Sequence, residues 1–288
     1  MVDVKKQVIY SDLDGTLLNY ENRKSFIGNK NVDAINKWIG KNNFFSIATG
    51  RNIGSVSRFF EDNHITIPYN LPMVLSNGTV VYDYQNKKII YQEIFNKQYI
   101  LESIEYVEKN DNALLVLLTP DKHYILEPKK ETNLKLPNFN YTLVKKDEIK
   151  YDEITKISFI VSMANQEKLL KDLTLFKSFD QVELIPSSPT YIELVNKGTS
   201  KFEGIKKALQ YANINDYNIY TIGDYLNDYD MIKRADLGFA PENAHEDVKS
   251  VADHKVGHHN NGAVAEMIMM LETKIKWYFC IIFFIFKL

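Results

Sequence analysis

The stretch QVIYSDLDGT, residues 7–16, decides which fold we expect for the chain. Residues 7–11 are mostly β-branched or aromatic, which is typical of a buried strand, and they end at a polar turn that carries Asp12 and Asp14. Gly15 would let the backbone turn sharply and bring amide N–H groups close to an anion. Two carboxylates in one tight loop can face one site, although a solvated Asp-Gly turn explains these residues equally well when they are taken alone.

Strands and helices alternate after this stretch in the order that builds a parallel sheet. Helical periodicity over residues 31–41 is followed by a buried strand at 44–48, a helix at 53–63 and a strand at 73–76. The alternation resumes later, with helices at 201–211, 228–234 and 263–273 and strands at 219–222 and 237–239. This order predicts an α/β fold, a Rossmann-like parallel-sheet core with helices on both faces.

The middle of the chain has a different pattern, in which strands lie closer together and alternate more between polar and apolar residues. Its expected strands are 88–92, 113–118, 123–126, 155–161 and 181–185, with helices at 97–109 and 166–176. We therefore expect an inserted α+β cap domain at residues 83–192. The core is then made of residues 1–82 and 193–274, and residues 275–288 form an apolar tail of unknown role.

Composition excludes several classes of protein. The 288 residues include 35 basic and 37 acidic side chains, so the net charge of -2 gives no basic face for nucleic acid. The single cysteine excludes a disulfide framework and fits a reducing cytosol, so a cytoplasmic protein is expected. Ten apolar residues, 277–286, are too few for a membrane-spanning helix, which needs about 20. We expect no clear membrane association and a monomer or homodimer.

Two further polar clusters are expected at the ends of elements in the core. Thr49, Gly50 and Arg51 follow the strand at 44–48 and precede a helix, where a hydroxyl and free N–H groups can bind an anion. Threonine is also a common helix N-cap, and that interpretation is the simpler one for this cluster alone. Lys201 opens a helix, where a cation opposes the helix dipole unless an anion compensates it. A solvated lysine is the simpler interpretation when this residue is taken alone.

The last cluster, residues 223–228, follows the strand at 219–222 and supplies two more carboxylates. Asp224 lies at the strand end and Asp228 opens a helix, so both can face the place where Asp12 and Asp14 converge. Three or four carboxylates in one place repel each other unless a divalent cation neutralises them. Ligands that are all oxygen suit magnesium.

These clusters together resemble the four motifs of the haloacid dehalogenase superfamily of phosphohydrolases. The resemblance rests on the stretch DLDGT at 12–16, Thr49, Lys201 and the stretch GDYLND at 223–228. The insertion between the second and third motifs, with the Ser-Asn-Gly turn at 76–78 before it, is similar to the Cof-type subfamily with a C2 cap. Residues 230–232 and 238–244 are also similar to that subfamily. The resemblance covers roughly residues 7–271.

The resemblance implies roles for the catalytic residues. Asp12 matches the nucleophile that forms an aspartyl-phosphate, and Asp14 matches the general acid and base. Lys201 matches the lysine that pairs with the nucleophile and the phosphoryl oxygens. Thr49 matches the phosphate-binding hydroxyl.

The resemblance also implies a Mg²⁺ site and further phosphate contacts. The metal would be held by the Asp12 carboxylate, the Asp14 backbone carbonyl and Asp224, with Asp228 as a supporting or alternate carboxylate. Binding of substrate or phosphate is expected at Leu13, Thr49, Gly50, Arg51 and Asn227.

The expected function is that of a magnesium-dependent phosphatase of small phosphorylated metabolites, such as sugar phosphates or phosphorylated cofactors. A hexose phosphomutase of a related capped branch and a non-catalytic metabolite sensor are the alternatives. Dehalogenases of the superfamily lack the second aspartate of the first motif, so Asp14 favours phosphate chemistry. Pro241 and Tyr225-Leu226 depart from the family pattern and leave the substrate open. We expect His254, His258 and His259 to lie in a solvated loop.

Overall fold

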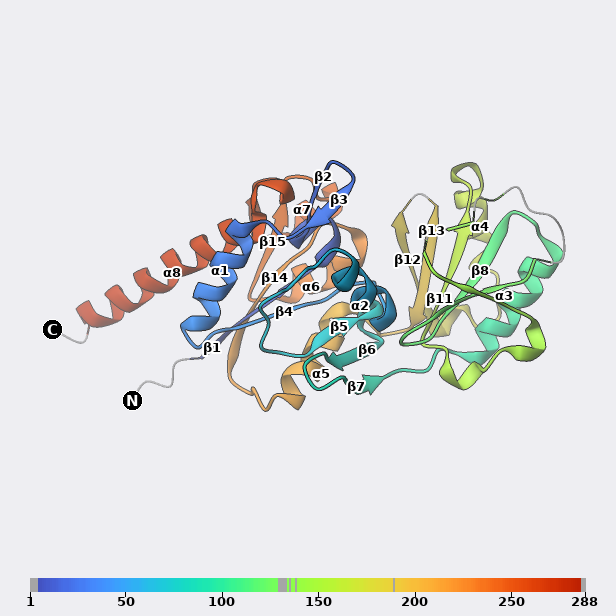
Figure 1. The fold of residues 1–288 in the computed structure, drawn as a ribbon, viewed down its shortest axis with the longest axis horizontal. Coiled ribbons are helices and arrows are strands. Elements are labelled where there is room, and N and C mark those ends of the chain that lie inside the picture. The colour runs from blue at the N-terminus through green and yellow to red at the C-terminus, as the bar shows by residue number, and fades with distance from the viewer. Residues whose placement is uncertain (1–4, 129–133, 135, 138, 189, 286–288) are drawn as a thin grey trace. The chain divides into compact units, whose positions relative to one another are not determined.

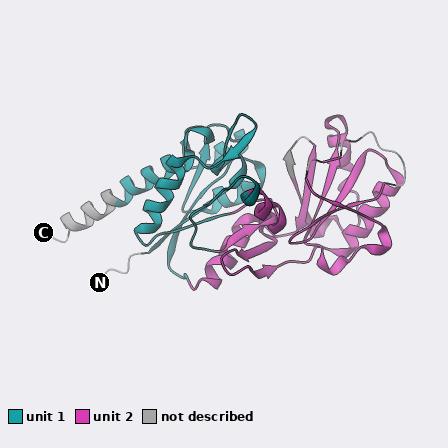
Figure 2. Cartoon of the chain, in the orientation of Figure 1, with its two compact units in different colours: residues 1–47, 60–71, 214–288 teal, residues 48–59, 72–213 magenta. Residues whose placement is uncertain are grey.

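The computed structural model describes residues 5–128, 134, 136–137, 139–188 and 190–285. The chain forms two compact units, coloured separately in Figure 2. The first consists of residues 1–47, 60–71 and 214–288, and the second of residues 48–59 and 72–213. The core of 1–82 and 193–274 and the cap of 83–192 stay predictions. By contact, residues 72–82 and 193–213 belong with the expected cap.

The first unit is built on a five-stranded sheet in the order β16-β15-β14-β1-β4, in which all neighbours are parallel. The strands are β1 (Lys6–Ser11), β4 (Phe44–Ile47), β14 (Tyr217–Ile222), β15 (Leu237–Pro241) and β16 (His254–Val256). The chain leaves β1 toward one edge and returns through β14 toward the other. The ends of β1 and β14 are therefore the topological switch point, where open parallel sheets bind ligands.

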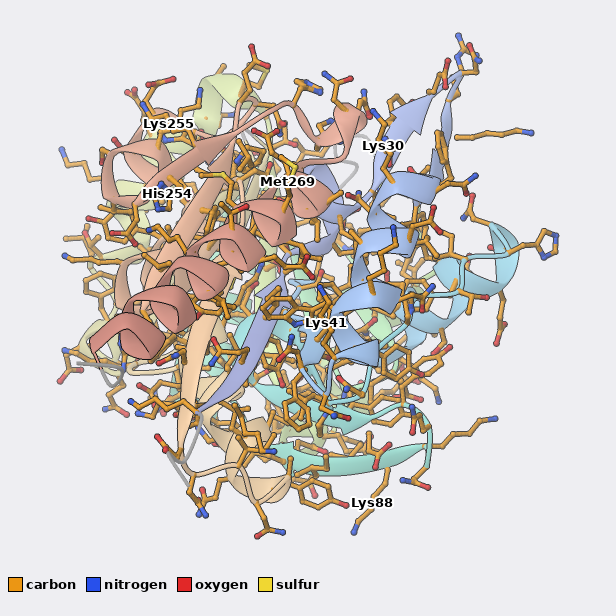
Figure 3. The ribbon with its side chains drawn as sticks, turned by 90° about the vertical axis from the view of Figure 1, so that its left-hand side faces the viewer. Lys30, Lys41, Lys88, His254, Lys255 and Met269 are labelled. Carbon is orange, nitrogen blue, oxygen red and sulfur yellow. The ribbon has the colours of Figure 1, made fainter. Side chains whose placement is uncertain are left out.

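The helices of the first unit are α1 (Asn29–Gly40), α6 (Tyr229–Arg234), α7 (Glu246–Val251) and α8 (Ala263–Ile285). Helix α1 packs beside α8, and Lys41, just after α1, forms an ion pair with Glu272 (Figure 3). Helix α6 packs on α7. Because the crossovers after β1 and β14 run in opposite directions across the sheet, right-handed connections place α1 and α6 on opposite faces. A hairpin of β2 (Asn19–Glu21) and β3 (Lys24–Phe26) precedes α1.

The second unit contains a six-stranded sheet in the order β10-β9-β8-β11-β13-β12. Its strands are β8 (Ala113–Leu118), β9 (His123–Leu126), β10 (Thr142–Val144), β11 (Lys156–Val161), β12 (Val182–Ser188) and β13 (Tyr191–Asn196). Strands β8, β11, β12 and β13 are labelled in Figure 1. Helices α3 (Lys97–Lys109) and α4 (Gln166–Leu173) bury one face, where residues such as Ile157 and Phe159 form the larger core. The opposite face carries a smaller cluster around Val116 and Ile160.

The rest of the second unit is a smaller layer, which contains the expected site residue Lys201. Strands β5 (Met73–Leu75), β6 (Val80–Asp83) and β7 (Lys88–Gln92) form a three-stranded antiparallel sheet, against which α5 (Lys201–Tyr211) packs. Helix α2 (Ile53–Asp62) begins in this unit. A parallel-sheet core with helices and an additional α+β sheet are both present, so the expected fold class is confirmed.

Two sequence-based expectations about elements are wrong, and one strand was missed. Residues 254–256 form the edge strand β16 instead of a loop, because His254 pairs with Phe239 of β15. Helix α8 continues to Ile285 instead of ending near residue 273, since no glycine or proline follows Thr273 to stop it. Strand β13 was missed, because the charged residue Glu193 interrupts its apolar run. No described helix is long and apolar enough to cross a membrane.

Two glycines of the second unit allow the energetic cost of backbone strain to be compared with the added cost of a steric clash. Gly78 and Gly198 both have positive φ, +98° and +81°. A Cβ on Gly78 would lie 2.0 Å from the Ser200 carbonyl oxygen, whereas a Cβ on Gly198 would meet nothing within 4 Å. We expect Gly198→Ala to lower the free energy of unfolding by about 1 kcal/mol through strain alone. Gly78→Ala should lower it by about 3 kcal/mol, because the backbone must also shift.

Chemical denaturation of both variants measures this difference. Equal losses of stability would show that the close approach between residue 78 and the start of α5 does not contribute to the cost of the Gly78→Ala substitution.

Candidate active site

Asp12 is held at the switch point by the sheet itself. Its backbone N–H donates to the carbonyl oxygen of Ile222 at the end of β14 (2.9 Å), and the residue is buried. The chain then makes a wide turn over Leu13–Leu17, which the N–H of Leu18 closes by donating to the Leu13 carbonyl oxygen (3.0 Å). The position of this carboxylate is therefore set by hydrogen bonds between parallel strands.

Three carboxylates converge at this point. Asp12, Asp224 and Asp228 each place one oxygen within 4.8 Å of the others. Asp224 accepts a hydrogen bond from the Thr16 hydroxyl (2.9 Å). One oxygen of Asp228 accepts from the backbone N–H groups of Asp224 (2.9 Å) and Tyr225 (3.1 Å). The structure thus brings together three of the four aspartates expected at the metal site.

Two glycines make room for these carboxylates. A Cβ on Gly15, whose φ is +74°, would lie 2.4 Å from an Asp224 carboxylate oxygen. A Cβ on Gly223 would lie 2.4 Å from the Asp228 carboxyl carbon. Any other residue at either position would displace a carboxylate, so the backbone on both sides of the group is shaped around acidic oxygens.

The donor set fits a divalent cation that prefers oxygen. Asp12 and Asp228 are buried and Asp224 is half-buried, so their negative charges are poorly screened by water and repel one another. One side-chain donor to the group is a neutral hydroxyl, that of Thr16. Acidic oxygens without nitrogen or sulfur are the ligands of Mg²⁺ and similar hard ions. The Asp14 side chain is exposed and outside this group, and its expected part in metal binding through the backbone carbonyl stays a prediction.

Some residues around the carboxylates were not expected from the sequence. The Asn243 amide donates to the Gly15 carbonyl oxygen (2.8 Å), and the N–H of His245 donates to the Asp224 carbonyl oxygen (2.8 Å). Asn243 lies in the stretch 238–244 that carries part of the family resemblance, which was the available signal. Asn227 is half-buried beside Asp228. The Leu13 side chain is fully buried, so only its backbone is available to a phosphate.

Thr49, Gly50 and Arg51 form a tight loop in the second unit. The Thr49 hydroxyl oxygen accepts a hydrogen bond from the N–H of Arg51 (3.3 Å), and the Thr49 N–H donates to the carbonyl oxygen of Val74 in β5 (2.9 Å). The guanidinium of Arg51 lies over the Phe59 ring, 4.1 Å from its centre. Thr49 is buried, so its hydroxyl has a defined position.

The turn at residues 76–78 connects this loop to Lys201. The N–H groups of Ser76 and Asn77 donate to the carbonyl oxygens of Arg51 (2.9 Å) and Thr49 (3.1 Å). The same turn touches the start of α5 through the close approach of Gly78 to Ser200. Lys201, the first residue of α5, is buried. Thr49 and Lys201, which are 152 positions apart in the chain, are thus supported by one three-residue turn.

Comparison with known proteins identifies the family. The chain matches the haloacid dehalogenase-like hydrolases over residues 9–268. It belongs to this family. The sequence-based resemblance is therefore confirmed, and so is the expectation of a hydrolase of the phosphatase type.

Several relatives extend over nearly the whole chain. A Bacillus subtilis (strain 168) protein, 5-amino-6-(5-phospho-D-ribitylamino)uracil phosphatase YcsE, is 27% identical over 92% of this chain and 96% of its own. The Escherichia coli (strain K12) pyridoxal phosphate phosphatase YbhA is 22% identical over 91% and 97%. The chain also matches an Arabidopsis thaliana protein named as a chloroplastic endoribonuclease, YBEY, at 26% identity, but it spans only 44% of that longer protein.

Solved structures share the fold. A HAD/COF-like hydrolase from Plasmodium vivax has a TM-score of 0.74 at 24% identity and covers 94% of this chain and 97% of its own. The subclass IIB sugar phosphatase BT4131 has the same TM-score at 19% identity and covers 93% and 99%. At these identities the similarity concerns the fold, including the additional sheet domain.

If the group of three carboxylates binds a divalent cation, we expect the stability of the folded state to depend on that cation. Mg²⁺ at ten times its dissociation constant should add about 1.4 kcal/mol to the stability of the folded state and raise the melting temperature by about 2–5 °C. Asp224→Asn should abolish this rise, because it removes one of the three charges.

The matched control is Asp236→Asn. The Asp236 carboxylate also accepts a hydrogen bond from a backbone N–H, that of Ile219 (2.7 Å), but it lies outside the group of three. Thermal melts with Mg²⁺ and with a chelator measure the effect. The assignment fails if both variants respond to Mg²⁺ as the unmodified protein does.

Proposed function

We propose that this chain is a Mg²⁺-dependent phosphatase that hydrolyses small phosphorylated metabolites through an aspartyl-phosphate intermediate. The observation that carries the proposal is the group of Asp12, Asp224 and Asp228 at the switch point of the parallel sheet, in a member of the haloacid dehalogenase-like hydrolases. Buried acidic oxygens beside a nucleophile are suited to phosphoryl transfer, which is catalysed mainly by positioning and by neutralisation of charge.

The reaction has two steps in this proposal. The Asp12 carboxylate attacks the phosphorus atom, and the ester P–O bond breaks as the leaving oxygen takes a proton from Asp14. Water then attacks the phosphorus of the aspartyl-phosphate while Asp14 accepts its proton, which releases inorganic phosphate and restores Asp12. Burial of Asp12 and exposure of Asp14 support this division, because Asp14 can exchange its proton with solvent.

The other site residues bind the metal and the phosphate in this proposal. Mg²⁺, held by Asp12, the Asp14 carbonyl and Asp224 with support from Asp228, would supply positive charge that offsets the phosphoryl oxygens. The Thr49 hydroxyl and the Lys201 ammonium bind phosphoryl oxygens. Further contacts come from the backbone of Leu13, from Gly50 and Arg51, and from the Asn227 amide.

The names of the relatives support the proposed substrate class. One is named for a phosphorylated ribitylaminouracil, one for pyridoxal phosphate, and a protein of similar fold is a sugar phosphatase. All three names denote small metabolites or sugars, so we propose a substrate of that size. A cytoplasmic location and a monomeric or dimeric state remain expectations from the sequence.

Asp12→Asn tests the nucleophile. We expect the kcat for p-nitrophenyl phosphate with Mg²⁺ to fall by about 10³-fold or more, because an amide cannot form the phospho-enzyme. The fold should be retained, since the hydrogen bond to Ile222 comes from the backbone of residue 12. Asp230→Asn is the control, because that partly exposed carboxylate pairs with Arg234 outside the group of three.

Asp14→Asn separates the two steps. If Asp14 acts as the base of the second step, this variant should accumulate the phospho-enzyme, which intact-protein mass spectrometry detects as one added phosphoryl group. Substantial turnover by Asp12→Asn, or a phosphoryl group found on another residue, would contradict the mechanism.

A further inference from the structure

An ion pair between a buried lysine and a half-buried glutamate lies on the face of the six-stranded sheet that α3 and α4 leave uncovered. Lys156, the first residue of β11, has a side chain that is 1% exposed, and it forms an ion pair with Glu193 of β13. Buried ion pairs are weak contributors to stability, because desolvation offsets their attraction. The pair therefore calls for an explanation other than folding.

The contacts of this pair lead to the loop that carries Thr49. The Lys156 ammonium also donates to the Gly50 carbonyl oxygen (2.9 Å). The second oxygen of Glu193 accepts from the side-chain amide of Asn77 (2.7 Å), and the backbone N–H of Asn77 donates to the Thr49 carbonyl oxygen (3.1 Å). Lys156 and Glu193 thus hold the carbonyl groups of both Thr49 and Gly50, one directly and one through Asn77.

The planar peptide bond transmits this constraint to the Thr49 hydroxyl. The Gly50 carbonyl and the Arg51 N–H belong to one peptide unit and point in opposite directions. When Lys156 fixes the carbonyl, it also fixes the N–H that donates to the Thr49 hydroxyl oxygen (3.3 Å). A hydroxyl that accepts from this N–H can turn its own proton toward a phosphate oxygen.

The titratable groups on the same face of the sheet are consistent with a charge pair formed by Lys156 and Glu193. In the sheet register, Lys156 lies opposite Leu118, which lies opposite His123, so the three side chains share one face. Burial, followed by the charge of Lys156, lowers the pKa of His123 to about 4, so its ring is neutral at neutral pH. Arg58 is the other cation that acts on this histidine. Glu193 is thus the carboxylate that compensates Lys156.

We propose that Lys156 and Glu193 are positioning residues for phosphate binding, which orient the Thr49 hydroxyl through the peptide between Gly50 and Arg51. The inference rests on the proposed phosphatase function and extends it to residues of the sheet domain. Neither residue touches the phosphate in this account. Both act through Thr49.

The double variant Lys156→Met/Glu193→Gln removes both charges together, so that neither is left buried alone, and the amide oxygen of the new glutamine can still accept from Asn77. We expect the KM for p-nitrophenyl phosphate and the inhibition constant of inorganic phosphate to rise about tenfold. The kcat should change much less, because the phosphate contact is made in the ground state and the transition state alike. Lys156→Arg, which keeps a cationic donor, should stay within about threefold of the unmodified protein.

The decisive comparison repeats the double variant in a Thr49→Ala background. If the pair acts through the Thr49 hydroxyl, it should cause no further rise in the inhibition constant once that hydroxyl is absent. If the pair only stabilises the sheet, its removal would lower the melting temperature and leave the inhibition constant of phosphate unchanged in both backgrounds. The control is Lys150→Met, which breaks the exposed ion pair with Glu153 in the same unit and should leave kinetics unchanged.

The outcomes distinguish failure of this inference from failure of the proposed phosphatase function. An active unmodified protein whose double variant keeps the original inhibition constant, or raises it equally with and without the Thr49 hydroxyl, overturns the inference and leaves the phosphatase function standing. An unmodified protein that is inactive on a broad panel of phosphate esters with Mg²⁺ overturns both. If the double variant does not fold, Glu193→Gln alone removes the charge and keeps one acceptor oxygen in place of two. It should then raise the constant about threefold, and an unchanged constant overturns the inference.

Discussion

Mutual repulsion between Asp12, Asp224 and Asp228 is the constraint around which the first unit is arranged. Two of these carboxylates are buried, and all three have oxygens within 4.8 Å of one another. Such a group persists only when rigid backbone holds it and a cation can neutralise it. The parallel pairing of β1 with β14 provides the first condition, because it ends both strands at the same level, Ser11 opposite Ile222.

The loops around the carboxylates are shaped by the same requirement. Gly15 and Gly223 leave the space that a Cβ would take from Asp224 and Asp228. Tyr225, which is bulkier than the residue usual in the family, packs edge-on against the His245 ring with 5.7 Å between ring centres. Its bulk is thus placed beside the acidic group without displacing it. This arrangement accounts for a departure from the family pattern next to the three carboxylates.

In the second unit, hydrogen bonds to the backbone position the groups expected to bind phosphate. The turn at 76–78 supports Thr49 on one side and the start of α5 on the other. The ion pair of Lys156 and Glu193 adds a link from the six-stranded sheet to the same loop. In the proposed function, the six-stranded sheet would in this way influence how tightly phosphate is held.

The motifs, the order of strands and helices in the core and the fold class could be predicted from the sequence, because they depend on local periodicity and on residues that follow strands directly. The convergence of Asp12 with Asp224 and Asp228 was also predictable, since parallel strands end at one edge of a sheet. Edge strand β16 and strand β13 were not predicted, because charged residues, Lys255 in β16 and Glu193 in β13, interrupt the apolar run that marks a buried strand.

Only the tertiary structure decided that Lys156 pairs with Glu193 and that both act on Gly50 and Asn77. These contacts depend on strand order and register, which bring together residues that are 37 and 106 positions apart in the chain. A lysine and a glutamate in separate strands look like ordinary surface charges until the sheet places them on one buried face.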